Sequence, residues 1–272
     1  MIWRLLNYRS YSAFENMAID EAIFRDTMKN KKPPTLRFFG WRPAAVSIGY
    51  FQELKNEIHF ERCRLSGVDI VRRMTGGKAV YHSDEVTYSL TAGNSAKLFP
   101  DNIGGTYEKI SLCLARGLSL LGINAHLAKA GAPGKEPDKT SCCFSVPSGH
   151  ELLVAGRKIC GSAQMRTQGG FLQHGSLLMT FDPVKTAALI LSPQTPEPDE
   201  KLRCSVTAVN EVIPSPVTAE TVCAVLQKGF SDELGIGLSE GTLTPAEKAL
   251  SARLVKKYES DAWNWERKKG SI

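Results

Sequence analysis

The order of the hydrophobic patterns along the chain constrains its fold more than any other feature of the sequence. Segments in which apolar and polar residues alternate fill the middle of the 272 residues, and segments with helical periodicity lie toward both ends. Strands and helices segregated in this way are typical of an α+β fold. The length fits one large domain, with or without a small appendage. We therefore expect a mixed β-sheet flanked by helices, with the helices covering one side of the sheet.

Local signals place the individual elements. Ser12 and Glu15 form a capping box in front of apolar residues at helical spacing, which predicts a helix over 13–29. Gly67 follows another helical pattern and is typical of a helix C-terminus. The remaining predictions are strands at 35–40, 45–50, 68–72, 86–91 and 171–181, a hairpin over 151–165, a surface loop at 130–140, and helices at 56–66, 103–121, 183–191, 217–233 and 244–259.

Composition excludes several classes of protein. No apolar stretch reaches the roughly 18 residues that a membrane-spanning helix needs. The first apolar run contains Arg4 and lacks a signal-peptide cleavage site. The net charge of +6 is spread along the chain, whereas nucleic-acid binders concentrate their charge. We therefore expect a cytoplasmic protein that binds neither membrane nor nucleic acid, although the mild positive charge would suit an acidic protein partner.

The cysteines and histidines argue against disulfides and metal sites. Seven cysteines are an odd number, and they are scattered over the whole chain, which is not a disulfide framework. No two cysteines have C-x-x-C spacing, and no two of the five histidines lie three to five residues apart. A structural zinc site is therefore not expected.

A glycine-rich block at residues 72–82 is the first candidate for chemistry. It has neither the spacing of a P-loop nor the G-x-G-x-x-G pattern of a dinucleotide site. Its adjacent Gly76 and Gly77 would still let backbone N–H groups approach a ligand carbonyl or phosphate. An ordinary glycine-containing hairpin explains the same residues equally well.

Cysteines and a lysine in two later blocks are the second candidate. Cys142 and Cys143 are adjacent, so on an extended chain only one of them can face a given pocket. On a strand, Lys158 and Cys160 would share one face. A buried lysine beside a thiol favours the thiolate. The commoner fate of a lysine is to extend its ammonium group into solvent.

Together these blocks resemble the lipoate–protein ligase and octanoyltransferase family, which is related in fold to the biotin–protein ligases. The sequence is most similar to the LipM-type octanoyltransferases of that family. One such motif would be weak, but their shared order along the chain is specific. The segments that carry the resemblance are 33–43, 47–52, 71–82, 85–89, 143–144, 156–159, 161–164, 173–176, 257–258 and 263–264.

The resemblance implies a role for each block. Cys143 would be the nucleophile, and Lys158 would lower its pKa. The glycine-rich block and the hairpin would line one acyl-binding tunnel, and no cofactor, metal or nucleotide would be needed. The substrate-binding residues implied in this way are Arg72, Arg73, Thr75, Gly76, Gly77, Lys78, His82, Gly161, Ser162, Ala163 and His174.

The same resemblance implies a reaction and its partners. The thiolate of Cys143 would attack the octanoyl thioester of acyl carrier protein. The lysine of a lipoyl domain, with glycine cleavage protein H as the expected acceptor, would then attack the octanoyl-enzyme. Residues 1–272 would form a single catalytic domain of the biotin and lipoate–protein ligase type, without the accessory domain of the ligases.

Three other functions compete with this one. An ATP-dependent lipoate–protein ligase would form an adenylate and need no cysteine, and a separate accessory subunit would make it compatible with this chain. An amidotransferase that moves octanoyl between lipoyl domains would also use a cysteine. A non-catalytic acyl-binding module would keep the tunnel glycines but have no use for a thiol beside a buried lysine.

Overall fold

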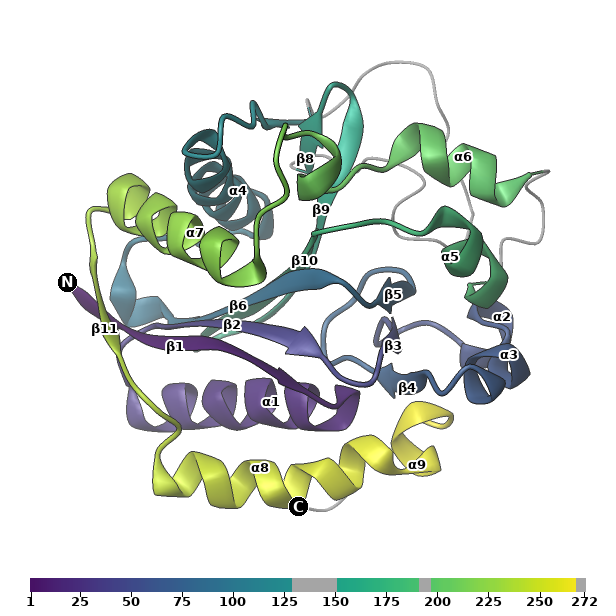
Figure 1. The fold of residues 1–272 in the computed structure, drawn as a ribbon. Helices are drawn as coiled ribbons and strands as arrows, with labels where there is room; N and C mark the ends of the chain where they lie inside the picture. The colour runs from purple at the N-terminus through teal and green to yellow at the C-terminus, as the bar shows by residue number, and fades with distance from the viewer. Residues whose placement is uncertain (129–150, 191–196, 268–272) are drawn as a thin grey trace.

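The larger of two sheets forms the centre of the molecule. The computed structural model describes residues 1–128, 151–190 and 197–267 (Figure 1), so the loop expected at 130–140 lies outside the described residues, as do Cys142 and Cys143. In the larger sheet, the first three strands are parallel and the other neighbours antiparallel. Its eight strands, in spatial order, are β11 (Gly237–Glu240), β1 (Ile2–Tyr11), β2 (Thr35–Trp41), β6 (Glu85–Gly93), β10 (Gly170–Leu178), β9 (Arg157–Thr167), β8 (Leu152–Val154) and β7 (His126–Leu127).

A smaller sheet presents the glycine-rich block to the larger one. Its central strand β3 (Ala45–Ile48) pairs in parallel with β4 (Asp69–Arg72) and antiparallel with β5 (Val80–His82). Residues 73–79, which we call the glycine loop, connect β4 to β5. The strands of this sheet agree with the patterns at 45–50 and 68–72.

Helices lie on both faces of the larger sheet (Figure 1). Helices α4 (Ile103–Ser119) and α7 (Ala219–Leu234) pack on one face, where the largest apolar cluster lies. Helices α1 (Ala13–Asn30) and α8 (Pro245–Glu259) lie on the opposite face. The α+β class with flanking helices is confirmed, but the expectation that one side would be covered is wrong. The alternate polar residues of the central strands suggested a solvent-facing side, and the structure buries them.

Elements with a clear local sequence signal were predicted, and most elements without one were not. The capping box of Ser12 and Glu15 is present at the start of α1, and the hairpin turns at Ala155 and Gly156, both with positive φ. The pattern at 56–66 forms two short helices, α2 (Leu54–Glu57) and α3 (Phe60–Leu65). The helices predicted at 183–191, 217–233 and 244–259 correspond to α5 (Pro183–Leu189), α7 and α8. Elements that were not predicted are β1, β5, β7, β11, α6 (Pro198–Ser205), α9 (Asp261–Asn264) and the short 3-10 turns η1 (Asn94–Ala96) and η2 (Val209–Glu211).

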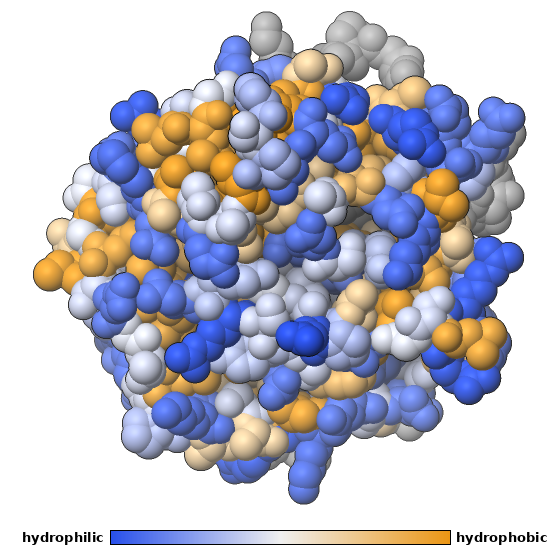
Figure 2. Space-filling model, viewed as in Figure 1, coloured by the Kyte–Doolittle hydropathy of each residue, from blue (hydrophilic) through white to orange (hydrophobic). Residues whose placement is uncertain are grey.

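Within the described part of the chain, no helix combines the length and the apolar character needed to cross a bilayer. Hydrophilic and hydrophobic side chains are interspersed over the face shown in Figure 2.

Candidate active site

Two cavities lie between the glycine loop and β9. The larger has a volume of about 640 Å³, within the range of roughly 300–1,000 Å³ typical of small-molecule sites. The smaller, of about 30 Å³, has room for about one water. The larger is lined by Glu21, Phe24, Arg25, Tyr50, Phe51, Met74, Gly76, Ile103, Gln164, Met165, Arg166, Lys257 and Trp263. The smaller is lined by Trp41, Ser47, Arg73, Val80, His82, Thr87, Gly161, Ser162, Ala163, His174, Gly175 and Ser176.

The glycine loop rests directly on the backbone after β3. A Cβ atom added to Gly49 would lie 1.9 Å from the carbonyl oxygen of Gly77, so no side chain fits there. Gly77 itself has a φ of +91°, which disfavours any other residue. A Cβ at Gly77 would also lie 3.6 Å from the Cβ of Ala163 on β9. The loop is thus held between Gly49 and β9, and Gly49 is a site residue that sequence reasoning did not single out, although it lies in the 47–52 motif.

The two arginines that precede the loop have different roles. The Arg73 guanidinium donates to the carbonyls of Gly76 and Lys78 and to the hydroxyl of Ser47, so it fixes the shape of the loop beside the smaller cavity. Arg72 was expected to bind substrate, but it lines neither cavity. Its guanidinium is fully buried and donates to backbone carbonyls of residues 49, 50, 52, 263 and 264. Arg72 therefore ties α9 to the segment after β3.

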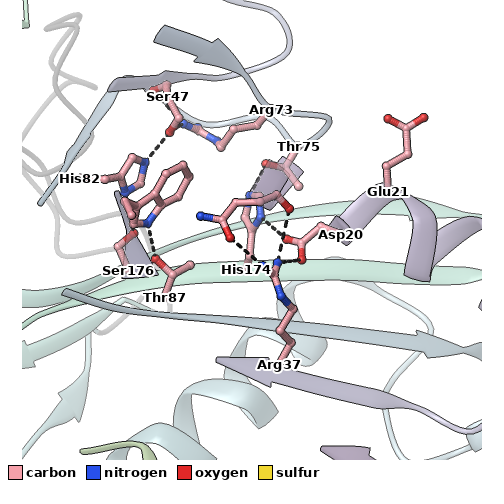
Figure 3. A network of polar contacts seen from close by, with 12 residues as sticks. Asp20, Glu21, Arg37, Ser47, Arg73, Thr75, His82, Thr87, His174 and Ser176 are labelled. Atoms are coloured by element: carbon pink, nitrogen blue, oxygen red, sulfur yellow. Dashed lines mark hydrogen bonds and ion pairs between the residues drawn. The ribbon is translucent and has the colours of Figure 1, made fainter. Parts of the chain in front are cut away.

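His174 on β10 is held between the glycine loop and α1 (Figure 3). Its Nε2 lies 2.8 Å from the Thr75 hydroxyl, and its Nδ1 lies 3.3 Å from the carboxylate of Asp20. Asp20 also accepts a 2.6 Å hydrogen bond from Arg37 on β2. A proton on Nδ1 satisfies the carboxylate, so Nε2 is the acceptor for Thr75.

The electrostatics of this group keep His174 neutral. Burial, together with the charges of Arg73 and His82, lowers the pKa of His174 and outweighs the raising effect of Asp20. Burial by itself would raise the pKa of Asp20, but Arg37 and His174 lower it below its usual value. The result is a buried ion pair of Arg37 with Asp20, and a neutral imidazole that fastens the glycine loop.

His82 is the centre of a second buried group on the other side of the smaller cavity (Figure 3). Its ring stacks on Trp41 with centroids 3.9 Å apart. Its Nδ1 lies 3.0 Å from Oε1 of Glu85, and its Nε2 lies 2.6 Å from the Ser47 hydroxyl. Burial alone would raise the pKa of Glu85, but His82, Thr87 and Ser176 lower it. Both ring nitrogens are thus engaged, which fixes His82 as a wall of the cavity.

The backbone of β9 supplies the opposite wall. Gly161, Ser162 and Ala163 line the smaller cavity, and their role in binding substrate stays a prediction. The Ser162 hydroxyl lies 2.8 Å from that of Tyr88, on the side of the sheet that packs on α7. Lys78 is half-buried, and its carbonyl accepts from Arg73.

Lys158 is completely buried, so the alternative that it extends into solvent is wrong. Its ammonium donates to Oε1 of Glu151 over 2.5 Å. Sequence reasoning did not identify Glu151 as this partner, because the two residues meet only when β8 pairs with β9. Lys158 lies three residues along β9 from Gly161, which lines the smaller cavity, but Lys158 itself lines neither cavity.

The cysteines that the structure describes either have a raised thiol pKa or line neither cavity. Burial raises the pKa of Cys160 to about 12, although Ser162 and Lys158 oppose the change. Burial likewise raises the pKa of Cys63 to about 11 and of Cys223 to about 12, and raises that of Cys113 further. Cys204 is exposed on α6 and lines neither cavity. In the described part of the chain, no three cysteine, histidine or acidic side chains gather as metal ligands would.

Comparisons with known proteins agree with this architecture. The model of the lipoyl protein ligase A/B catalytic domain matches residues 12–231. Proteins named octanoyltransferase LipM are 39% identical in Kyrpidia tusciae and 37% identical in Bacillus subtilis, over 97% of this chain and 98% of each relative. Among solved structures, lipoate-protein ligase A bound with ATP superimposes with a TM-score of 0.81 at 27% identity, over 97% of this chain and 99% of the other. A T. acidophilum protein with bound lipoic acid gives 0.81 at 25% identity, over 98% and 99%.

These matches decide the class of the protein. The fold and the full-length relatives agree, and the family model covers most of the chain. The chain belongs to the lipoyl protein ligase A/B family, among its LipM-type octanoyltransferases, and is an acyltransferase.

Proposed function

We propose that this chain transfers an octanoyl group from acyl carrier protein to the lysine of a lipoyl domain in lipoate biosynthesis, through a thioester on Cys143. The full-length match to octanoyltransferases carries the proposal. The buried ammonium of Lys158, on the strand that lines the smaller cavity, is the geometric feature that supports it.

The chemistry balances without a nucleotide. The Cys143 thiolate attacks the carbonyl carbon of the octanoyl thioester on the carrier, a new thioester forms on Cys143, and the carrier leaves as a thiolate that takes up a proton. The neutral amine of the acceptor lysine then attacks this thioester, an amide forms as the amine gives up one proton to solvent, and Cys143 is released as the thiolate. The first step exchanges one thioester for another of similar energy, so the acyl group stays reactive for the second.

The proposed roles of the other residues follow from their positions. The apolar walls of the larger cavity suit a saturated acyl chain. Backbone N–H groups of the glycine loop would face the oxygen that becomes negative during each attack. Lys158 would favour the Cys143 thiolate by its charge. Arg72 would act on the site through the backbone of residues 49, 50 and 52. The other residues proposed to bind the substrate lie in the glycine loop or line the smaller cavity, and they are Arg73, Thr75, Gly76, Gly77, Lys78, His82, Gly161, Ser162, Ala163 and His174.

The decisive experiment is the intact mass of the protein after mixing with octanoyl-acyl carrier protein in the absence of ATP. The expected result is an adduct heavier by one octanoyl group, absent from Cys143→Ser. Adding apo-glycine cleavage protein H should discharge the adduct and octanoylate the H protein. Comparing initial rates with an isolated dehydrogenase lipoyl domain tests the preferred acceptor. An adduct that persists in Cys143→Ser would overturn the cysteine assignment.

An ATP-dependent lipoate–protein ligase is the second candidate, because a ligase bound with ATP matches the fold so well. The same mass experiment with free lipoate and ATP separates the two functions. Formation of a lipoyl-adenylate, with no octanoyl adduct from the carrier, would support the ligase.

We further propose that residues 1–272 act as one catalytic domain. The relatives align over 98% of their own length, which supports this. The purified chain should therefore complete both half-reactions with no other protein than carrier and acceptor.

A further inference from the structure

A carboxylate faces the ammonium of Lys158 inside the protein. Lys158 has no exposed surface, and the side chain of Glu151 is 10% exposed. Their atoms Nζ and Oε1 lie 2.5 Å apart. Glu151 immediately precedes β8, whose residue Leu153 pairs with Lys158.

The backbone of Lys158 is fixed independently of this ion pair. On one side β9 pairs with β8, and on the other the carbonyl of Lys158 accepts from the N–H of Thr207 over 2.9 Å. Val206 forms an isolated parallel bridge with Lys158. The ion pair is therefore not needed to hold β9 in place. Glu151 acts on the side chain of Lys158 and on its charge.

Removing an ammonium group from water costs several kcal/mol unless an opposite charge compensates it. A buried lysine without such a partner gives up its proton instead. The structure repeats this arrangement at its other buried cation on the sheet, where Asp20 faces Arg37. Lys158 differs from Arg37 because an amine can lose its proton at accessible pH and a guanidinium does not.

We propose that Glu151 is a positioning residue that keeps Lys158 protonated and directs its ammonium group. The proposal rests on the proposed function, in which Lys158 assists acyl transfer by its charge. Glu151 need not touch the substrate, and its carboxylate is unchanged by the reaction.

Among the described residues, two other titratable groups near Lys158 are Cys160 and Glu211, and neither replaces the charge of Glu151. Cys160 lies two residues further along β9, and its pKa of about 12 keeps it an uncharged thiol. Glu211 on η2 accepts a hydrogen bond from the Thr207 hydroxyl. Glu211 is exposed and is therefore screened by water, whereas Glu151 is largely buried.

The variant Glu151→Gln isolates the charge, because glutamine has almost the same size and still accepts through Oε1. Without the negative charge, Lys158 should lose its proton at a pH lower by about 1–3 units, the usual effect of one close charge. The rate of acyl-enzyme formation should then decline at a correspondingly lower pH on its alkaline side. Glu151→Asp keeps the charge one methylene shorter and should restore part of the profile. Glu211→Gln, the matched control, should leave it unchanged.

Two measurements test this. The first is an NMR titration of the ¹⁵N-labelled lysine Nζ, with the Lys158 signal assigned by its absence from Lys158→Met. The second is the pH dependence of single-turnover acyl-enzyme formation. Circular dichroism and thermal unfolding confirm that each variant is folded. An unchanged titration in Glu151→Gln, or an equal shift in Glu211→Gln, would overturn the proposal.

The experiment separates this proposal from the proposed function. If Lys158→Met transfers octanoyl at the full rate, the role of Lys158 in the reaction is wrong, whatever the titration shows. If Lys158→Met is inactive and Glu151→Gln titrates as the unmodified protein does, Lys158 acts in the reaction and Glu151 does not control it.

Discussion

The two faces of the central sheet are both buried, yet the pKa values of their acidic groups shift in opposite directions. Strand β6 shows this within one element. Its residues 86, 88, 90 and 92 are Val, Tyr, Leu and Ala, and they join the apolar cluster under α4 and α7. Its residues 85, 87, 89 and 91 are Glu, Thr, Ser and Thr, and they are buried on the opposite face.

The pKa shifts separate the same two faces. On the apolar face burial acts with little opposition, so the pKa values of Tyr88 and Cys160 are raised. On the polar face cations and donors outweigh burial, so the pKa values of Asp20 and Glu85 are lowered. Burial alone therefore keeps acids neutral, and a buried charge exists only where a partner is provided. Both histidines of the site lie on the face where such partners exist.

The largest effect is expected for acyl transfer when the proposed nucleophile, Cys143, is compared with Cys160 of the apolar face. Cys143→Ser should lower acyl transfer by at least about 10³-fold, because the hydroxyl of serine is a far weaker nucleophile than a thiolate. Cys160→Ser and Cys142→Ser should keep transfer within a few-fold of the unmodified rate. Steady-state transfer to a lipoyl domain measures all three. Equal loss in the three variants would remove the distinction between the cysteines.

A second prediction compares the loss of a polar group from each face. Asp20→Asn leaves the Arg37 guanidinium buried without its charged partner and should cost about 3–5 kcal/mol of unfolding free energy. Tyr88→Phe removes a neutral hydroxyl and should cost about 1 kcal/mol. Urea unfolding followed by fluorescence measures both. Similar losses of unfolding free energy in Asp20→Asn and Tyr88→Phe would show that removing a charged partner from the polar face costs no more than removing a neutral hydroxyl from the apolar face.

The third prediction concerns the close backbone contact on the polar face. Gly49→Ala should cost about 1–3 kcal/mol, because a Cβ would meet the carbonyl of Gly77 and the backbone must move. Acyl transfer should fall as well, since the glycine loop is displaced. Gly237→Ala is the control, because its Cβ would meet only Ile2 at an ordinary 3.6 Å. Unfolding and transfer rates that are the same for both variants would contradict the tight contact.

The smallest expected effect is the pH dependence that His174 introduces. Its pKa in the folded protein lies below 6.5, the ordinary value, so the unfolded chain binds more protons as the pH falls. The unfolding free energy should therefore begin to decrease as the pH drops through about 6.5, and the decrease ends below the folded pKa.

Chemical unfolding at a series of pH values between 7.5 and about 4.5 measures this slope. His174→Gln should flatten it. His59→Gln is the control, because the pKa of the more exposed His59 is also lowered, by burial and by Arg62. If the slope persists in His174→Gln and disappears in His59→Gln, the pH dependence comes from His59, and the prediction for His174 is wrong.

Elements with strong local signals could be predicted from the sequence. The capping box at Ser12 starts α1, and Ala155 and Gly156 turn the hairpin, because each signal acts within a few residues. Strand β1 carries several polar residues, and β11 has four residues in all, so neither has a clear pattern of its own. β1 is a strand because it pairs with both β2 and β11, and β11 is one because it pairs with β1 across more than 230 residues.

The candidate site could be predicted as a set of blocks but not as a set of contacts. The motifs located the glycine loop and the wall formed by Gly161, while the position of Cys143 stays a prediction because it lies outside the described residues. The partners Asp20, Arg37 and Glu151 were not identified, because a charged residue usually faces solvent and these three meet their partners only in the folded protein. Arg37, a cation within a run of apolar strand residues, was the one available signal. The substrate-binding role of Arg72 stays a prediction that the cavities do not support, because a motif does not say which way a side chain points.

The contacts of Arg72 have a consequence for how the protein is made. Its guanidinium binds carbonyls of Trp263 and Asn264, 191 and 192 residues further along the chain. A ribosome synthesises β4 and the glycine loop long before it reaches that segment. Arg72 acquires these partners only after 191 further residues have been synthesised, so the start of the glycine loop receives these contacts long after the loop itself has been made.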